Sequence, residues 1–276
     1  MKGKIIFFLI AIALVAIFFW LKANSYNLAN ITSNLSTPDI PTTDYPTIGD
    51  IPTPEGFVRT TEGNTTFAAY LRSLTLKKGR PKVYTYNGKE KRNQNAHWAV
   101  VDIDTGDKDL QQCADATMRL WAEYLYKHKR YDEIKFNFLG DGKPRYYTDY
   151  AKGDYSYPTF RKYLEWIFTY ANTASLYHEL KTIDVKDLRP GDLFIFKGVP
   201  LGHAVIVVDM AQHPKTAEKV FMLVQGWIPA QDLHLLKNPN DGKLSPWYST
   251  NFGDALTTPE FVFDQSNGYK IKRYGK

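Results

Sequence analysis

The sequence contains one cysteine, Cys113, and this residue is its best candidate nucleophile. A helix that starts at Asp109 places the thiol at the end of the first helical turn, where free backbone N–H groups and the helix dipole favour a thiolate. The carboxylates of Asp107, Asp109 and Asp115 oppose ionisation, so a reactive thiol here needs a cation nearby. The alternative is a small buried residue, which is the commonest fate of a free cysteine.

A candidate general base follows at the start of a predicted strand. His203 directly precedes an apolar run, residues 204–208, in a predicted strand over 204–209. A thiol hydrolase needs its histidine near the cysteine in space and not in sequence, so this separation along the chain is acceptable. The alternative for His203 is a loop histidine bonded to a backbone carbonyl.

The imidazole also needs an acceptor for its second ring nitrogen. Asp209 is excluded, because six residues of strand place it about 20 Å from His203. Gln225 ends the next predicted strand, 220–225, and its amide oxygen can accept this bond. Trp227 is then placed to shield the bond from water. The alternative for Gln225 is a polar residue that faces solvent at the end of a strand.

Four short blocks resemble the NlpC-type and CHAP-type papain-like cysteine hydrolases, which cleave cell-wall peptides: residues 112–115 (QCAD), 190–193 (PGDL), 202–207 (GHAVIV) and 225–227 (QGW). The resemblance implies that Cys113 attacks an amide or ester carbonyl, that His203 relays the proton and that Gln225 holds the imidazole ring. It further implies that Gln112 supports the oxyanion and that Trp227 covers the site.

The elements that must position these residues follow from hydrophobic periodicity and turn signals. They predict helices over 66–74, 109–128 and 160–180, and strands over 83–88, 98–103, 192–196, 204–209 and 220–225. The predicted fold is α+β, with a papain-like (NlpC/CHAP-like) core in which one Cys-bearing helix packs on an antiparallel sheet. A helical and loop insertion, 129–187, separates the helix from the sheet. With no internal repeat and no second linker, 51–276 is predicted to be a single domain. That whole stretch resembles an uncharacterised bacterial family, domain of unknown function 4846, which implies no known activity.

The N-terminus predicts export. Lys2 and Lys4 precede an unbroken apolar run, 5–21, in the pattern of a secretory signal. The run reaches the lower limit of a spanning helix and ends in bulky residues, so we expect a signal anchor over 1–22, with a cleaved signal peptide as the alternative. Residues 23–50 are rich in Asn, Ser, Thr and Pro and predict a tether. Both alternatives place the domain outside the cytoplasm, membrane-anchored or secreted.

Composition excludes several classes of protein. One cysteine among 276 residues rules out an internal disulfide and multi-cysteine zinc. The net charge of +6 is dispersed along the chain, which favours an anionic neighbour such as a lipid surface or cell-wall polymer over nucleic acid. His97, Cys113 and His203 include no short-spaced pair, so no metal is expected, and no phosphate loop suggests a cofactor.

Tyrosines cluster in the insertion, and two hypotheses for function remain open. The cluster either lines a glycan-binding groove or covers the edge of the core: Tyr146, Tyr147, Tyr150, Tyr155 and Tyr157. The leading hypothesis is an exported cysteine hydrolase, an amidase or peptidase that acts on a cell-wall peptide or other amide. The alternative is a non-catalytic envelope-binding domain on the same scaffold, in which Cys113 is buried and inert.

Overall fold

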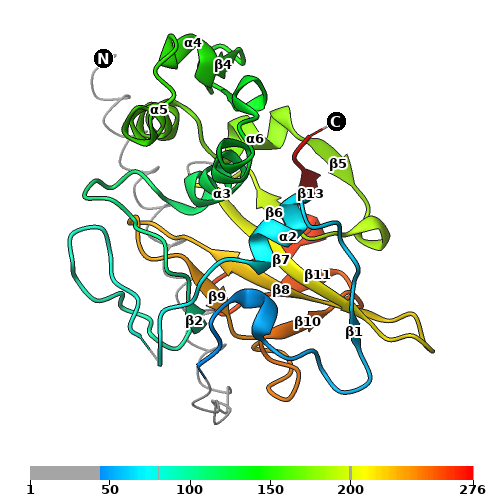
Figure 1. Cartoon of the computed structure of the whole chain (residues 1–276). Coiled ribbons are helices and arrows are strands. Elements are labelled where there is room, and N and C mark those ends of the chain that lie inside the picture. Colours follow the sequence, from blue (N-terminus) through cyan, green and yellow to red (C-terminus); the bar gives the residue numbers. More distant parts are fainter. Residues whose placement is uncertain (1–43, 80, 199–200, 276) are drawn as a thin grey trace, which may run out of the picture. The chain divides into compact units, whose positions relative to one another are not determined.

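The computed structural model describes residues 44–79, 81–198 and 201–275, and its centre is a nine-stranded sheet (Figure 1). The strands of this sheet are β1 (Val58–Arg59), β2 (His97–Val100), β5 (Lys181–Ile183), β6 (Asp192–Phe196), β7 (His203–Gln212), β8 (Lys219–Gln225), β9 (His234–Leu236), β10 (Trp247–Ser249) and β13 (Lys270–Arg273). The main order is β2-β9-β8-β7-β6-β13-β5, while β1 pairs with β7 and β10 with β8. All these pairs are antiparallel.

Helices and two small hairpins surround the sheet. The helices are α2 (Phe67–Arg72), α3 (Cys113–Lys127), α4 (Tyr147–Ala151), α5 (Tyr157–Tyr170) and α6 (Thr173–Glu179), and short 3-10 helices are η1 (Ile48–Asp50), η2 (Tyr131–Glu133), η3 (Val185–Asp187) and η4 (Gln265–Asn267). The hairpins are β3 (Lys135–Asn137) with β4 (Pro144–Tyr146), and β11 (Ala255–Thr257) with β12 (Val262–Asp264). The domain is therefore α+β, with a large antiparallel sheet.

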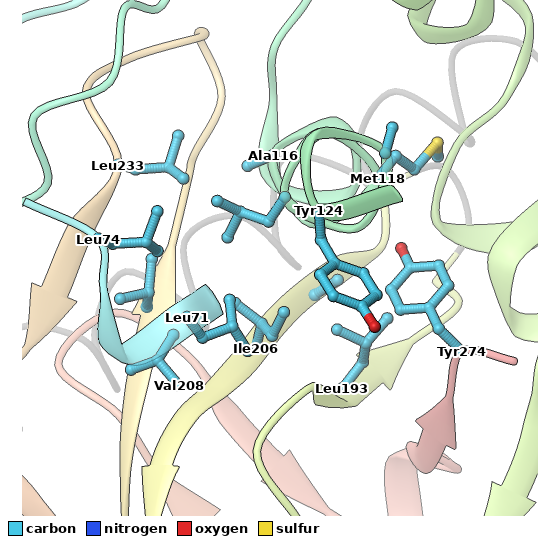
Figure 2. Packing of buried hydrophobic residues seen from close by; sticks show 14 of the residues in the cluster. Leu71, Leu74, Ala116, Met118, Tyr124, Leu193, Ile206, Val208, Leu233 and Tyr274 are labelled. Carbon is cyan, nitrogen blue, oxygen red and sulfur yellow. The ribbon is translucent and has the colours of Figure 1, made fainter. Parts of the chain in front are cut away.

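The two faces of the sheet bury different clusters. Successive side chains of a strand point to opposite faces, and β7 follows this rule. Ile206 and Val208 belong to the core shared with α2 and α3, and Figure 2 shows both beside Leu71 of α2. Val205 and Val207 belong to a second cluster, which includes residues of the β11–β12 hairpin. The helices and the hairpin thus cover opposite faces.

The central strands are confirmed: β6 spans the predicted 192–196, and β7 and β8 begin one residue before their predicted starts. The predicted helix at 66–74 is α2, shorter at both ends. The prediction of a continuous strand over 83–88 is wrong, because only isolated β-bridges form there.

Helix α3 begins four residues later than predicted. The carboxylate of Asp109 accepts hydrogen bonds from the Ala230 N–H at 2.7 Å and from the Gln112 side chain at 3.0 Å, so it ties the preceding loop to the chain after β8. The carboxylate of Asp115 accepts the Gln112 backbone N–H at 3.1 Å and completes the N-terminus. Cys113 is consequently the first helical residue instead of the end of the first turn.

The predicted helix over 160–180 is two helices. α5 ends at Tyr170, and Asn172 then adopts an extended backbone and caps α6 by accepting from Ala174 N–H and Ser175 N–H. Asparagine competes with the helix for backbone hydrogen bonds, which is why it favours a cap here over a helix interior.

The domain starts before the predicted boundary at residue 51. Ile48 is fully buried, and the ring of Tyr45 stacks on Trp98 with centroids 5.8 Å apart. All described residues belong to one compact unit. The predicted anchor, 1–22, and most of the predicted tether lie outside the described residues. Within the described ranges, no helix is both long and apolar enough to cross a bilayer.

Candidate functional site

The Cys113 thiol is held by backbone groups at the start of β7. Its sulfur lies 3.9 Å from the Gly202 carbonyl oxygen, to which the S–H donates. The sulfur accepts from the backbone N–H of Ala204 and of Ala114 and from the Thr173 hydroxyl. Toward the start of β7, the pairing with β8 ends at Ile206. At Gly202 and Ala204, the thiol of Cys113 therefore makes the backbone hydrogen bonds that a neighbouring strand makes farther along β7.

Two glycines permit this close approach. A Cβ on Gly226, just after β8, would lie 3.1 Å from both the Gln112 carbonyl oxygen and the Ala116 Cβ in the first turn of α3. A Cβ on Gly202 would lie 2.5 Å from the Phe196 carbonyl oxygen. Gly226 thus lets the start of α3 lie close to the end of β8, while Gly202 lets the chain before β7 lie close to the end of β6 and to Thr173 of α6.

The surroundings of the Cys113 thiol favour its protonated form. Only 3% of Cys113 is exposed, and burial, together with the neighbouring Asp115, raises the pKa of the thiol to about 11. Burial also raises the pKa of Asp115 well above its usual value. The helix-terminal N–H groups that favour a thiolate are present, but desolvation outweighs them.

The structure does bring His203, Gln225 and Trp227 together. His203 Nε2 donates to Gln225 Oε1 at 3.2 Å, the bond expected from the sequence. The Trp227 ring stands edge-on to the imidazole, with centroids 4.5 Å apart, and covers it. Burial lowers the pKa of His203 to about 3, so its imidazole is neutral at physiological pH.

Behind this pair lies a buried polar network that the sequence did not predict. Gln225 Nε2 donates to Glu260 Oε2 at 2.7 Å and to His234 Nε2 at 3.1 Å. Glu260 Oε2 also accepts from Lys91 Nζ at 2.6 Å. His234 Nδ1 in turn donates to the Asp232 carbonyl oxygen at 2.9 Å. Both the oxygen and the nitrogen of the Gln225 side-chain amide therefore form hydrogen bonds within this network.

The body of helix α3 and the His203 imidazole lie on opposite faces of the sheet. His203 alternates with Ala204, so its ring shares the face of Val205, where it packs at 5.8 Å from the Phe263 ring. Helix α3 packs on the other face. In the described part of the chain, no hydrogen bond joins Cys113 to His203.

A separate groove of about 350 Å³ opens beside α3. Arg119, Glu123 and Lys127 line it at four-residue spacing, so they form one ridge of the helix. The rest comes from α2 and the chain that follows it, the segment after β2, and the start of α5: Tyr70, Ser73, Leu74, Thr75, Asp102, Ile103, Asp104 and Tyr157. α2 and α3 are neighbours in the fold (Figure 1).

The Arg119 guanidinium organises the groove's floor although it is only 1% exposed. It donates to Asp104 Oδ1 at 2.7 Å, to Gln111 Oε1 at 2.6 Å and to Glu123 Oε1 at 3.3 Å. Tyr157 donates its hydroxyl to the same Glu123 oxygen at 2.7 Å. The positive charge of Arg119 is thus fully engaged by two carboxylates of the groove.

Comparison with known protein families shows the family to which the chain belongs. The sequence pattern of the family described as domain of unknown function (4846) matches residues 49–270. The chain belongs to this family. No curated protein and no solved structure showed significant similarity to it. The matched residues include Cys113, the polar network, the groove and every strand of the sheet except β13, of which only Lys270 is matched.

The structure also shows where the remaining residues considered in the sequence analysis lie. Asp209, excluded as a partner of His203, binds Arg59 at 2.6 Å and Arg72 at 2.5 Å. Of the tyrosine cluster, Tyr147 is fully buried, while Tyr157 is 44% exposed at the groove. No group of metal-ligating side chains was found among the described residues.

Sequence reasoning missed Glu260, Lys91 and the groove. Glu260 lies in the turn of the β11–β12 hairpin, in a stretch with weak periodicity, and nothing local marks it as buried. The ridge on α3 was accessible to prediction, because residues spaced by four on a helix share a face.

Proposed function

We propose that this chain is an extracytoplasmic envelope protein whose domain binds its target without hydrolysing it, on a papain-like core. The observation that carries the proposal is the state of Cys113: a buried thiol, bonded to Gly202 and Ala204, with no hydrogen bond to His203 among the described residues. A nucleophilic cysteine requires a base within hydrogen-bond reach. The side-chain alternation of β7 turns this histidine to the face of the sheet away from α3.

The papain-like part of the proposal is supported by the order of elements. A helix that begins at its cysteine packs on an antiparallel sheet, and the later strand β7 begins at a histidine. In this proposal the catalytic order of residues is present, but the thiol has a structural role. His203, Gln225 and Trp227 likewise serve a buried network that stabilises the sheet.

The location at the envelope is supported by the N-terminal sequence. Two lysines and a long apolar run at 1–22 fit a signal anchor, and the tether that follows fits a domain held away from the bilayer. The dispersed positive charge suits a surface that carries anionic lipid or cell-wall polymer. Membrane and soluble fractions of expressing cells, probed for the full chain, test this directly. A cytoplasmic soluble pool alone would refute it.

Thiol labelling tests the non-catalytic state. A pKa of about 11 leaves roughly one thiol in a thousand ionised at pH 8, about a hundredfold fewer than for an ordinary cysteine. We expect iodoacetamide to label the native full chain at least a hundredfold more slowly than the urea-unfolded chain. Rapid labelling of the native protein near neutral pH would contradict the proposal.

A binding assay tests the function itself. The full chain in detergent is sedimented with purified cell-envelope material, and released amino groups are measured. We expect wild type and Cys113→Ser to sediment equally and to release nothing. Release of amino groups by wild type that is lost in Cys113→Ser would establish the cysteine hydrolase instead.

A further inference from the structure

We infer that the groove beside α3 is the ligand site of this domain, and that it captures a peptide through a primary ammonium group on a lysine-like side chain. The inference rests on the proposed binding function and adds the site and the chemical class of the ligand.

The first argument is an unused carboxylate oxygen. Glu123 lines the groove with a side chain that is only 13% exposed. Its Oε1 accepts from Arg119 and Tyr157, whereas its Oε2 has no hydrogen-bond partner in the described ranges. A carboxylate that is largely withdrawn from water binds a cationic donor more strongly than an exposed one.

The second argument is the tyrosine beside it. The Tyr70 hydroxyl has no hydrogen-bond partner among the described residues. Burial, and then the charge of Glu123, raise the pKa of Tyr70, so the phenol stays neutral and can accept from an ammonium. The ring already attracts such a group: the Lys127 ammonium lies 5.8 Å from its centroid.

The third argument is the sign of the charge. The carboxylates of the groove are Asp102, Asp104 and Glu123, and its cations are Arg119 and Lys127. Arg119 is engaged by the carboxylates of Asp104 and Glu123, and Asp102 has no ion pair in the part of the chain that the structure describes. Arg161 also binds Asp104, at 3.0 Å. The carboxylate oxygens left for a ligand are therefore those of Asp102 and the second oxygen of Glu123, and these attract a cation.

The size and lining of the groove indicate what the ligand carries besides its ammonium group. A volume of about 350 Å³ is near the lower end of the range for small-molecule sites, so the groove admits a side chain and not a folded partner. Leu74 and Ile103 provide apolar surface for an alkyl stem, leaving the ammonium for Glu123 and Tyr70. A peptide backbone would then lie across the opening.

Two matched probes test the inference on the full chain by NMR titration. Nα-acetyl-lysinamide carries one ammonium and no other charge, and Nα,Nε-diacetyl-lysinamide carries none. We expect saturable binding of the first only. Glu123→Gln should weaken it about tenfold to a hundredfold, the range for a hydrogen bond to a charged group. Tyr70→Phe should weaken it less. Asp132→Asn, an equal change of charge outside the groove, should leave it unchanged.

Equal binding of both probes, no binding of either, or equal effects of Glu123→Gln and Asp132→Asn would overturn the inference. Glu123 also supports Arg119, so thermal unfolding verifies the fold of its variant. If that variant unfolds, Asp102→Asn and Tyr70→Phe decide the outcome. Envelope material whose amines have been acetylated separates the two proposals. Undiminished sedimentation with it overturns only the ligand class, whereas failure to sediment with untreated material overturns the proposed function.

Discussion

The ion pair between Lys91 and Glu260 offers the strongest quantitative test of the buried network. Lys91 Nζ lies 2.6 Å from Glu260 Oε2, and the two side chains are only 5% and 9% exposed. At that separation, an effective dielectric constant of about 20 gives an attraction of about 6 kcal/mol. Withdrawing each ion from water costs several kcal/mol, so the intact pair contributes little net stability while either charge left alone is costly.

Single and double variants should therefore behave non-additively. Lys91→Met leaves the Glu260 carboxylate with only the amides of Gln225 and Asn93, at an expected cost of about 3 kcal/mol. Glu260→Gln leaves the Lys91 ammonium without a carboxylate, at about 3–5 kcal/mol. The double variant removes both charges and should unfold within about 1 kcal/mol of wild type.

Urea unfolding followed by tryptophan fluorescence measures these differences. The matched control is Lys82, whose Nζ lies 2.7 Å from Glu90 Oε1 in a pair that is 55% and 51% exposed. Lys82→Met should leave the urea midpoint unchanged, because solvent screens an exposed pair. If the double variant loses the sum of the two single losses, the two charges are not coupled and the argument from burial fails.

Three further predictions follow from burial and close packing. Burial lowers the pKa of His203 to about 3 and that of His234 well below its usual value. Below pH 6.5 the unfolded chain therefore binds more protons than the native one, and stability should fall by about 1.4 kcal/mol per pH unit for each histidine. Urea midpoints from pH 7.5 to 5 should show this fall, and a flat profile would contradict it. Cys113→Ala leaves backbone groups of β7 unpaired and should cost about 1–3 kcal/mol in thermal unfolding, while Cys113→Ser should retain most of that stability; equal melting of the two variants would refute the thiol's structural role. Gly226→Ala should cost about 1–3 kcal/mol through overpacking, whereas Gly140→Ala, with nothing within 4 Å of its added Cβ, should be neutral; a neutral Gly226→Ala would mean that α3 can shift.

The sequence was most informative where burial is continuous. The strands β6, β7 and β8 are apolar runs bounded by turn residues, and their starts were predicted to within one residue, although β7 extends three residues beyond its predicted end. The meeting of His203 with Gln225 followed from the same strands, because antiparallel neighbours bring the start of one beside the end of the next.

The sequence was least informative for side chains whose hydrogen-bond partners are far away along the chain. Asp109 looked like a helix cap, but its carboxylate binds the Ala230 N–H, a partner remote in sequence. Glu260 stands in a polar hairpin and becomes buried only because that hairpin folds over Gln225 and Lys91. Such placements depend on tertiary packing, which local periodicity does not encode.

The face on which His203 lies has the largest consequence for function. A motif with cysteine before histidine gives the order of two groups along the chain, whereas catalysis depends on which side of a strand the histidine occupies. Within β7, Ala204 and Ile206 face α3, and His203 and Val205 face the hairpin. A shift of one residue in the strand would exchange these sets. The extensive apolar burial on both faces opposes that shift, because it would carry every buried side chain of β7 to the wrong cluster. The same packing that stabilises the sheet therefore keeps the imidazole on the face away from α3. The binding function that we propose then relies on the groove beside α3, which offers acceptors without a partner among the described residues.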